Sequence, residues 1–245
     1  MRKLLGVASL VGMALAGVAG TPAVGQKPGY TFEVKLDVVP RKAGTENRPR
    51  GSTLKGRFVA GQPLGQEPPV ITAGRVLLPR GIAYNGDKYP RCSKVTLQND
   101  ADECPKRSIM GAGSGNAYAD TVITTPKLVF YNGGANWMYA YTTYFNPAFV
   151  QEPVPIQVKR LSGRRWSYEI EFGVPYNLQV IAGVPITPSD VPFSVGGKAY
   201  ARDYLATNAG CPKRGFRPYV VSLDYRFYPD GATGTSVDRG RLACR

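Results

Sequence analysis

Apolar and polar residues alternate along this chain in short runs with a period of two, which is typical of half-buried β-strands. The run at residues 30–38, YTFEVKLDV, places every second side chain on one apolar face. The run at residues 219–227 repeats this pattern, and no stretch shows a sustained helical period. Because glycine and proline separate the runs, the pattern predicts an all-β fold, an antiparallel β-sandwich or jelly roll.

Two hairpins are expected from strand patterns that flank turn residues. Residues 127–131 and 136–145 flank Asn132-Gly133-Gly134, which supplies the positive φ angles of a tight turn. Residues 154–161 and 165–172 flank Ser162-Gly163. Further strands are predicted at residues 54–59, 70–78, 117–125, 178–181, 191–195 and 235–242, loops at 41–53 and 61–69, and one helical turn at 94–98 capped by Ser93.

The first 25 residues have the pattern of a secretory signal peptide. Met1-Arg2-Lys3 precedes an apolar run, Leu4–Val18, that is short for a transmembrane span, and small residues follow. Cleavage would fall after Ala19 or Gly25. The alternative is an uncleaved anchor helix. We expect a secreted or cell-envelope protein with no later transmembrane span and one β-sandwich domain at 26–245, with a loose sub-boundary near 146–153.

The chain is basic, with a net charge of +14, and loss of the signal segment would remove two basic and no acidic residues to leave +12. Such a charge could attract an anionic cell-envelope polymer, a polysaccharide or a lipid surface. Because no run exceeds two basic residues, a scattered solubilising charge is the favoured interpretation, and nucleic acid is not expected. The basic pairs are Arg41/Lys42, Arg48/Arg50, Lys106/Arg107, Lys159/Arg160, Arg164/Arg165, Lys213/Arg214 and Arg239/Arg241.

Four cysteines in an exported chain predict two disulfides, for which three connectivities exist. We favour Cys92–Cys104 and Cys211–Cys244, because each cysteine then pairs with its nearest neighbour in sequence. The chain has no histidine and no C-x-x-C pair, so neither a zinc site nor Ser-His-Asp catalysis is expected within it. No metal or cofactor is therefore predicted.

Glu169 and Glu171 are the candidate catalytic carboxylates, because they share one face of a predicted strand at a spacing that suits a glycosidase pair. The surrounding segment resembles the E-x-D-x-E strand of the laminarinase-like jelly-roll glycosidases. Ser167 stands at the position of that family's nucleophile, and a hydroxyl cannot replace a carboxylate there. In the alternative, Trp166, Tyr168, Ile170 and Phe172 face the core and both glutamates are solvated.

Trp137, Tyr139 and Tyr141 alternate along one strand and are the candidate ligand-binding residues. If exposed, they would stack on sugar faces, whereas buried aromatic residues at such positions form core. An acidic group lies between Cys92 and Cys104, where oxygen ligands could hold Ca²⁺, but a solvated turn is favoured because the EF-hand spacing is absent. Its members are Asn99, Asp100, Asp102 and Glu103.

The stretch from Leu77 to Gly115 carries the most distinctive motif of the chain, L-P-x-G, then P-x-C-S, then C-P-x-x-S-x-x-G-x-G. In this motif the chain resembles a group of uncharacterised exported proteins from high-GC Gram-positive bacteria. The resemblance implies an exported location and the pairing of Cys92 with Cys104, and no catalytic residues. The glycine run Gly111–Gly115 lacks the helix that a phosphate loop needs, so we expect it to serve a bend.

These observations favour an exported, all-β binding or structural module of the cell envelope or extracellular space, without enzymatic activity of its own. The alternative function is a secreted carbohydrate-active enzyme that uses Glu169 or Glu171.

Overall fold

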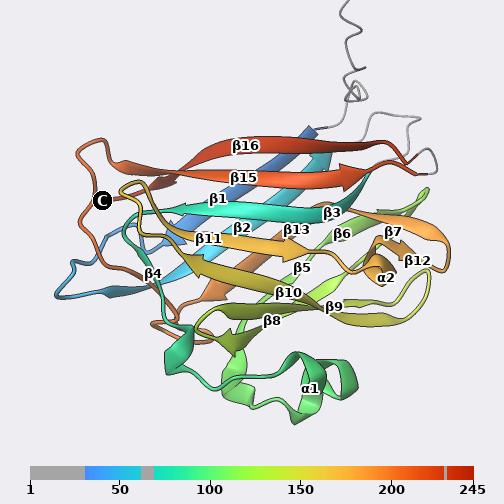
Figure 1. Ribbon diagram of the computed structural model, residues 1–245, viewed down its shortest axis with the longest axis horizontal. Coiled ribbons are helices and arrows are strands. Elements are labelled where there is room, and N and C mark those ends of the chain that lie inside the picture. Colours follow the sequence, from blue (N-terminus) through green and yellow to red (C-terminus); the bar gives the residue numbers. More distant parts are fainter. Residues whose placement is uncertain (1–30, 62–68, 229–230) are drawn as a thin grey trace, which may run out of the picture.

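The computed structural model describes residues 31–61, 69–228 and 231–245, and shows the expected all-β, sandwich-like fold (Figure 1). The strands are β1 (Thr31–Val39), β2 (Arg50–Gly61), β3 (Val70–Pro79), β4 (Ile82–Tyr84), β5 (Ile109–Ser114), β6 (Asn116–Ala119), β7 (Val122–Thr124), β8 (Lys127–Gly134), β9 (Trp137–Tyr144), β10 (Val150–Arg160), β11 (Trp166–Gly173), β12 (Val180–Ile181), β13 (Val184–Gly196), β14 (Leu205–Thr207), β15 (Phe216–Arg226) and β16 (Thr233–Ala243). The helices are α1 (Lys94–Asn99) and α2 (Tyr176–Gln179), with single 3₁₀ turns at Gly86–Lys88, Ala101–Glu103 and Lys106–Ser108.

The strands form one antiparallel sheet in the order β16-β15-β3-β11-β10-β9-β8-β5-β13-β2-β14-β4, and β1 pairs with β2. The sheet folds over on itself into two layers. Figure 1 shows β16, β15, β3, β11, β10, β9 and β8 in the front layer, with β1, β2, β13 and β5 crossing behind them. The inward side chains of the two layers face each other, so the core lies between them.

The two layers meet again where β1 lies beside β16, and side chains rather than backbone pairs join these strands. The Val34 amide donates to Asp238 Oδ2 over 2.9 Å. Tyr219 Oη, from β15, donates to the Val34 carbonyl over 2.9 Å and accepts from the Leu36 amide over 3.1 Å. These bonds satisfy backbone groups on the edge of β1 that would otherwise need another strand.

The strongest alternating runs form the strands that they predict. Phe32, Val34, Leu36 and Val38 are buried on the inward face of β1, and the run at 219–227 gives the buried face of β15. The hairpin of β10 and β11 also forms as predicted, with Val158 opposite Ile170. Tyr168, Ile170 and Phe172 pack against the core, as expected for that face of β11.

Both predicted disulfides form, Cys92–Cys104 and Cys211–Cys244. The first closes a segment that carries α1, which begins after Ser93 as predicted, with the Thr96 amide donating to Ser93 Oγ over 2.9 Å. The second ties the loop before β15 to the end of β16. The strand at 109–114 leaves the first disulfide segment directly and pairs with β8 and β13.

The first hairpin turns later than predicted. Asn132 lies within β8 because its side-chain amide donates to the carbonyls of Gly86, Tyr89 and Pro90, at 2.9–3.0 Å. The chain therefore turns at residues 135–136, after Gly134 at φ +114°. A buried polar side chain with this many partners outweighs the turn preference of the Asn-Gly pair.

Three other expectations about local structure were wrong. Residues 117–125 form two short strands, β6 and β7, because the chain reverses at Asp120, whose φ is +56°. The strand predicted at 178–181 forms only at Val180–Ile181 (β12), because residues 178–179 lie in α2, where Pro175 starts a turn that Gln179 Nε2 closes onto the Val174 carbonyl over 2.7 Å. The predicted loop at 41–53 ends early, at Arg50, where β2 begins. Most of the predicted loop at 61–69 lies outside the described residues.

Candidate functional site

An apolar cavity of about 280 Å³ lies between the two layers of the sheet. Strands of both layers line it, among them β1, β2, β3, β8, β9, β10, β11, β13 and β15. No lining residue is acidic or basic, and the few polar ones are threonine and tyrosine. A cavity with such walls suits an apolar molecule, because a buried charge or unpaired polar group would find no partner there.

Aromatic rings that lie flat on neighbouring strands keep this interior open. Phe172 stands directly opposite Gly74, and Phe193 directly opposite Gly56. A Cβ atom at either glycine would collide with the ring of its partner, so each ring lies over the glycine rather than pointing across the cavity. Phe172 and Phe193 line the cavity and stay only half-buried although they face inward.

The sequence pattern did not lead us to predict the interior cavity, although Gly56 and Gly74 were a signal for it. A glycine inside a strand often marks a place where another group approaches closely. Gly56 and Gly74 both lie within predicted strands. Their aromatic partners, however, lie in other strands, and the pairing register that brings each ring onto its glycine cannot be read from either segment alone.

Two of the polar residues of the cavity wall, Tyr84 and Tyr204, lie side by side. Tyr84 Oη lies 3.0 Å from Tyr204 Oη and donates to the Gly134 carbonyl (2.8 Å) or the Trp137 carbonyl (2.9 Å). Tyr204 Oη is 3.3 Å from Asn132 Oδ1. Burial raises the pKa of Tyr84 to about 12 and also raises the pKa of Tyr204. Both phenols are therefore protonated at neutral pH and cannot act there as bases.

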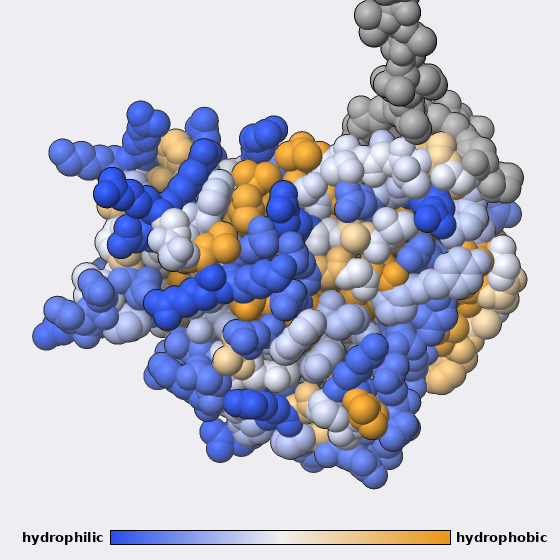
Figure 2. Space-filling model, viewed as in Figure 1, coloured by the Kyte–Doolittle hydropathy of each residue, from blue (hydrophilic) through white to orange (hydrophobic). Residues whose placement is uncertain are grey.

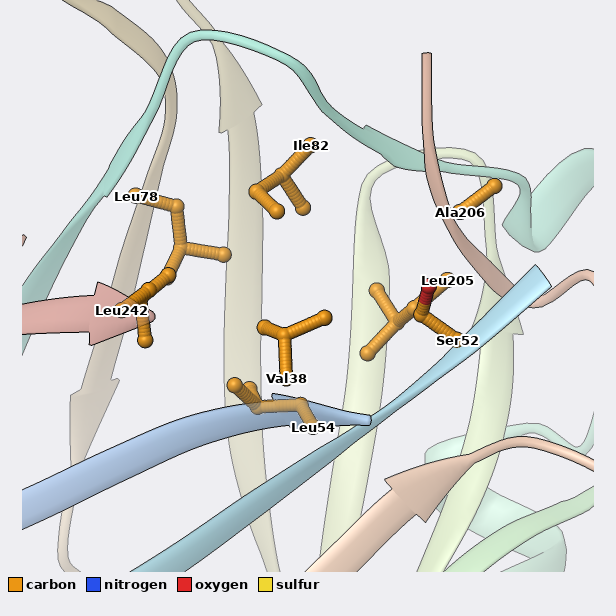
Figure 3. Close-up of a pocket in the computed structure, with 8 residues that line it drawn as sticks. All are labelled: Val38, Ser52, Leu54, Leu78, Ile82, Leu205, Ala206 and Leu242. Carbon is orange, nitrogen blue, oxygen red and sulfur yellow. The ribbon is translucent and has the colours of Figure 1, made fainter. Parts of the chain in front are cut away.

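A second, much smaller void of about 10 Å³ lies at the β4 and β14 side (Figure 3). Figure 3 shows Leu54, Leu205 and Leu78 among the apolar side chains that converge on it, and these three also line the large cavity. The void holds at most about one water molecule. This void is therefore too small to hold a ligand.

Glu169 and Glu171 lie outside the cavity wall, within a row of charges. Glu169 is paired with Arg75 at 3.4 Å and with Lys159 at 3.9 Å, and Glu171 is paired with Lys159. The hydrogen bond from Lys159 holds the pKa of Glu171 below its usual value. A glycosidase acid needs a raised pKa, so this arrangement favours a structural charge row over catalysis.

The aromatic row of β9 serves in large part as a platform for the first disulfide segment. Tyr139 and Tyr141 are half-buried and pack on the cluster formed by Cys92, Leu97, Cys104 and Tyr131. The rings of Tyr131 and Tyr141 meet edge to face, with centroids 6.2 Å apart. Trp137 has an exposed fraction of 40% and is the member of the row most open to solvent.

In the acidic group between Cys92 and Cys104, the Asp100 side chain accepts a hydrogen bond from the Asp102 amide and caps a 3₁₀ turn.

The fold gathers several of the separate basic pairs at one end of the molecule, near the C-terminus. The Arg245 amide donates to the Arg41 carbonyl over 2.8 Å, and the Arg80 amide to the Arg165 carbonyl over 3.1 Å. Figure 2 shows hydrophilic residues projecting from this side. We call this region the basic end. Its exposed members are Arg41, Lys42, Arg80, Arg164, Arg165, Lys213, Arg214, Arg241 and Arg245.

Arg217 is a buried cation at this end. Its guanidinium donates to the carbonyls of Ala209 and Gly210, and burial lowers its pKa. It thereby fixes the loop that carries Cys211, which is bonded to Cys244 beside the C-terminus. The basic end is thus built on a loop held by a disulfide and by a buried arginine.

No helix in the described ranges is long and apolar enough to cross a membrane. Comparison with known proteins finds no matching family model, no matching curated protein and no matching solved structure.

Proposed function

We propose that this chain is an exported, non-catalytic binding protein that holds an apolar molecule in its interior cavity. The observation that carries this proposal is the cavity of about 280 Å³, whose described walls carry no charge. Its size approaches the lower end of the range for small-molecule sites, roughly 300 Å³. A smaller apolar cavity, of roughly 150 Å³, is already enough to take up benzene.

An unfilled cavity of this size would be expensive for the fold. At ~24 cal/mol per Å³, 280 Å³ corresponds to a loss of about 7 kcal/mol. The net stability of a domain is only about 5–15 kcal/mol. An apolar occupant would restore the missing contacts, so the cavity is better explained as a binding site than as a packing defect.

The chemistry around the cavity supports binding rather than catalysis. Tyr84 and Tyr204 are protonated phenols whose neighbours are carbonyls and an amide. The two glutamates considered as catalytic residues are paired with Lys159 and Arg75, away from the cavity. Within the described residues, no cluster of three or more histidine, cysteine, aspartate or glutamate side chains could hold a metal ion.

The two disulfides and the signal-peptide pattern of residues 1–25 support an extracellular or cell-envelope location.

The basic end favours a second function, attachment to an anionic cell-envelope polymer, because at least nine exposed cationic side chains share one region. Pull-down on purified cell-wall polymer across a salt series tests this second function. Binding that weakens with salt supports it, and equal recovery on an uncharged polymer contradicts it.

The cavity is tested by titration with 1-aminoanthracene, a neutral fluorophore that brightens in apolar surroundings. Ala140 lines the cavity and is buried, so Ala140→Phe fills part of it. Ala135→Phe adds the same atoms in the exposed turn between β8 and β9 and is the matched control. We expect the wild type and the control to bind the fluorophore and Ala140→Phe to bind at least tenfold more weakly. Equal binding by all three proteins would overturn the proposal.

A further inference from the structure

Five large apolar side chains are exposed in three connections of the sheet. Val122 and Ile123 are on β7, Phe145 and Phe149 are the first and last residues of the connection from β9 to β10, and Tyr176 is on α2. Their exposed fractions are 53%, 59%, 56%, 63% and 65%. Single exposed apolar residues need no explanation, but a group of them marks a surface that contacts something apolar. We call these five residues the apolar rim.

One ring contact and two hydrogen bonds link the three connections to one another. The rings of Phe145 and Phe149 have centroids 5.7 Å apart. Thr124 Oγ1, at the end of β7, donates to the Asn146 carbonyl over 2.7 Å. Asn177, beside Tyr176, donates to Glu152 near the start of β10 over 2.8 Å. Figure 2 shows hydrophobic residues along the side of the molecule where Figure 1 places β7 and α2.

The rim lies at one end of the cavity. Each of its three segments also contributes a residue to the cavity wall within three positions along the chain. Tyr144 lines the cavity directly before Phe145, and Leu178 lines it two residues after Tyr176. Pro126 lines it three residues after Ile123. Tyr144, Leu178 and Pro126 are buried, so at this end one layer of buried side chains separates the exposed rim from the cavity.

A lipid bilayer fits this end better than a flat protein partner does. The rim residues come from separate connections rather than from one strand face, so they can enter between lipid headgroups side by side. Lys127 Nζ lies 5.2 Å from the centre of the Phe145 ring, which places a cation beside the apolar group where a lipid phosphate would be. An occupant that matches the cavity is also poorly soluble in water, and a bilayer is its natural source.

We propose that the apolar rim seats this protein on a lipid bilayer, and that the cavity takes up a single acyl chain of a bilayer lipid through this end. This inference rests on the proposed function for the identity of the occupant. The seating itself depends only on the rim. The two can therefore fail separately.

Flotation of the mature protein with phosphatidylcholine vesicles tests the seating. Phe145→Ser with Phe149→Ser removes two rim rings. Val95→Ser with Val237→Ser removes two exposed apolar side chains elsewhere, on α1 and β16, whose exposed fractions are 65% and 47%. We expect the wild type and this control to float, and the rim variant to float at least fivefold less. All three should bind 1-aminoanthracene equally, because the cavity is unchanged.

Several results would overturn the proposal. The first is that the wild type does not float, and the second is that the rim variant floats as well as the wild type. The third is that the wild type floats only with phosphatidylglycerol vesicles and that salt abolishes this flotation, which would assign the contact to the basic end. A rim variant that changes the molecular mass in sedimentation from dimer to monomer would assign the rim to a second copy of the chain. If Ala140→Phe floats normally but binds no fluorophore, the seating stands independently of the cavity.

Discussion

Tyr219 on β15 lies across Gly240, its directly opposite partner on β16, and its hydroxyl reaches the backbone of β1 beyond. A Cβ atom at Gly240 would overlap the Tyr219 ring. Tyr225 and Gly234 repeat this relationship on the same two strands. Glycines on β16 thus make room for tyrosines of β15 to join the two layers of the sheet.

Gly240→Ala should therefore loosen this junction. The added methyl group displaces Tyr219 and breaks its bonds to Val34 and Leu36, which leaves buried backbone groups unpaired. We expect a loss of about 2–4 kcal/mol in the free energy of unfolding, measured by urea denaturation. Gly163→Ala, at a glycine with open space around it, is the control and should change it by less than about 0.5 kcal/mol. A loss of that small size at Gly240 would show that the junction does not depend on the tyrosine.

Gly74→Ala should partly fill the cavity, because the new Cβ atom displaces the Phe172 ring and also crowds Leu223, a second residue of the cavity wall. The new methyl group pushes the Phe172 ring off the sheet and toward the interior. We expect at least tenfold weaker binding of 1-aminoanthracene, measured by fluorescence titration. Gly173→Ala, next to Phe172 but with open space around its Cβ position, is the matched control and should bind like the wild type. Unchanged binding in Gly74→Ala would mean that the ring does not define the cavity.

Stability should fall in alkaline solution as the buried phenols ionise. The pKa of Tyr84 is about 12 in the fold against an ordinary value of 10.0, because burial disfavours the phenolate. Because the pKa of Tyr84 is raised in the fold, the protonated phenol makes its full contribution to stability below pH 10, and this contribution is lost as the pH rises from 10 to 12. The shift of two units corresponds to about 3 kcal/mol.

Urea denaturation at pH 8 and pH 11 measures this loss. Tyr84→Phe removes one ionising group and should reduce the difference between the two pH values, and Tyr200→Phe, a partly exposed tyrosine, is the control. Equal stability of the wild type at both pH values would contradict the burial of these phenols.

The alternating runs were sufficient to predict the strands that have one buried face. β1 and β15 follow the period of two because only one side of each meets the core. β13 was predicted only at residues 191–195, yet it spans Val184–Gly196. Pro185, Pro188 and Pro192 interrupt its pattern, and proline in a strand normally indicates an edge or an end. Tertiary pairing with β2, β5 and β6 outweighs that preference.

The candidate sites were harder to predict because they depend on long-range register. The basic pairs at 41–42, 164–165 and 213–214 are far apart in sequence, and only the layered sheet brings their loops to one end. The cavity is a space between two layers, so no single segment encodes it. The glutamates of β11 were correctly placed on one strand, but their neighbours Arg75 and Lys159 come from β3 and β10.

The central claim, that the cavity holds an apolar molecule, is tested most directly on protein purified without organic solvent from the cells that express it and from their medium. Native mass spectrometry of the wild type and of Ala140→Phe, followed by solvent extraction, measures the bound molecule and its mass. We expect one apolar molecule per chain in the wild type and none in Ala140→Phe. A wild-type protein with an empty cavity, which takes up nothing when incubated with a membrane lipid extract, would contradict the account.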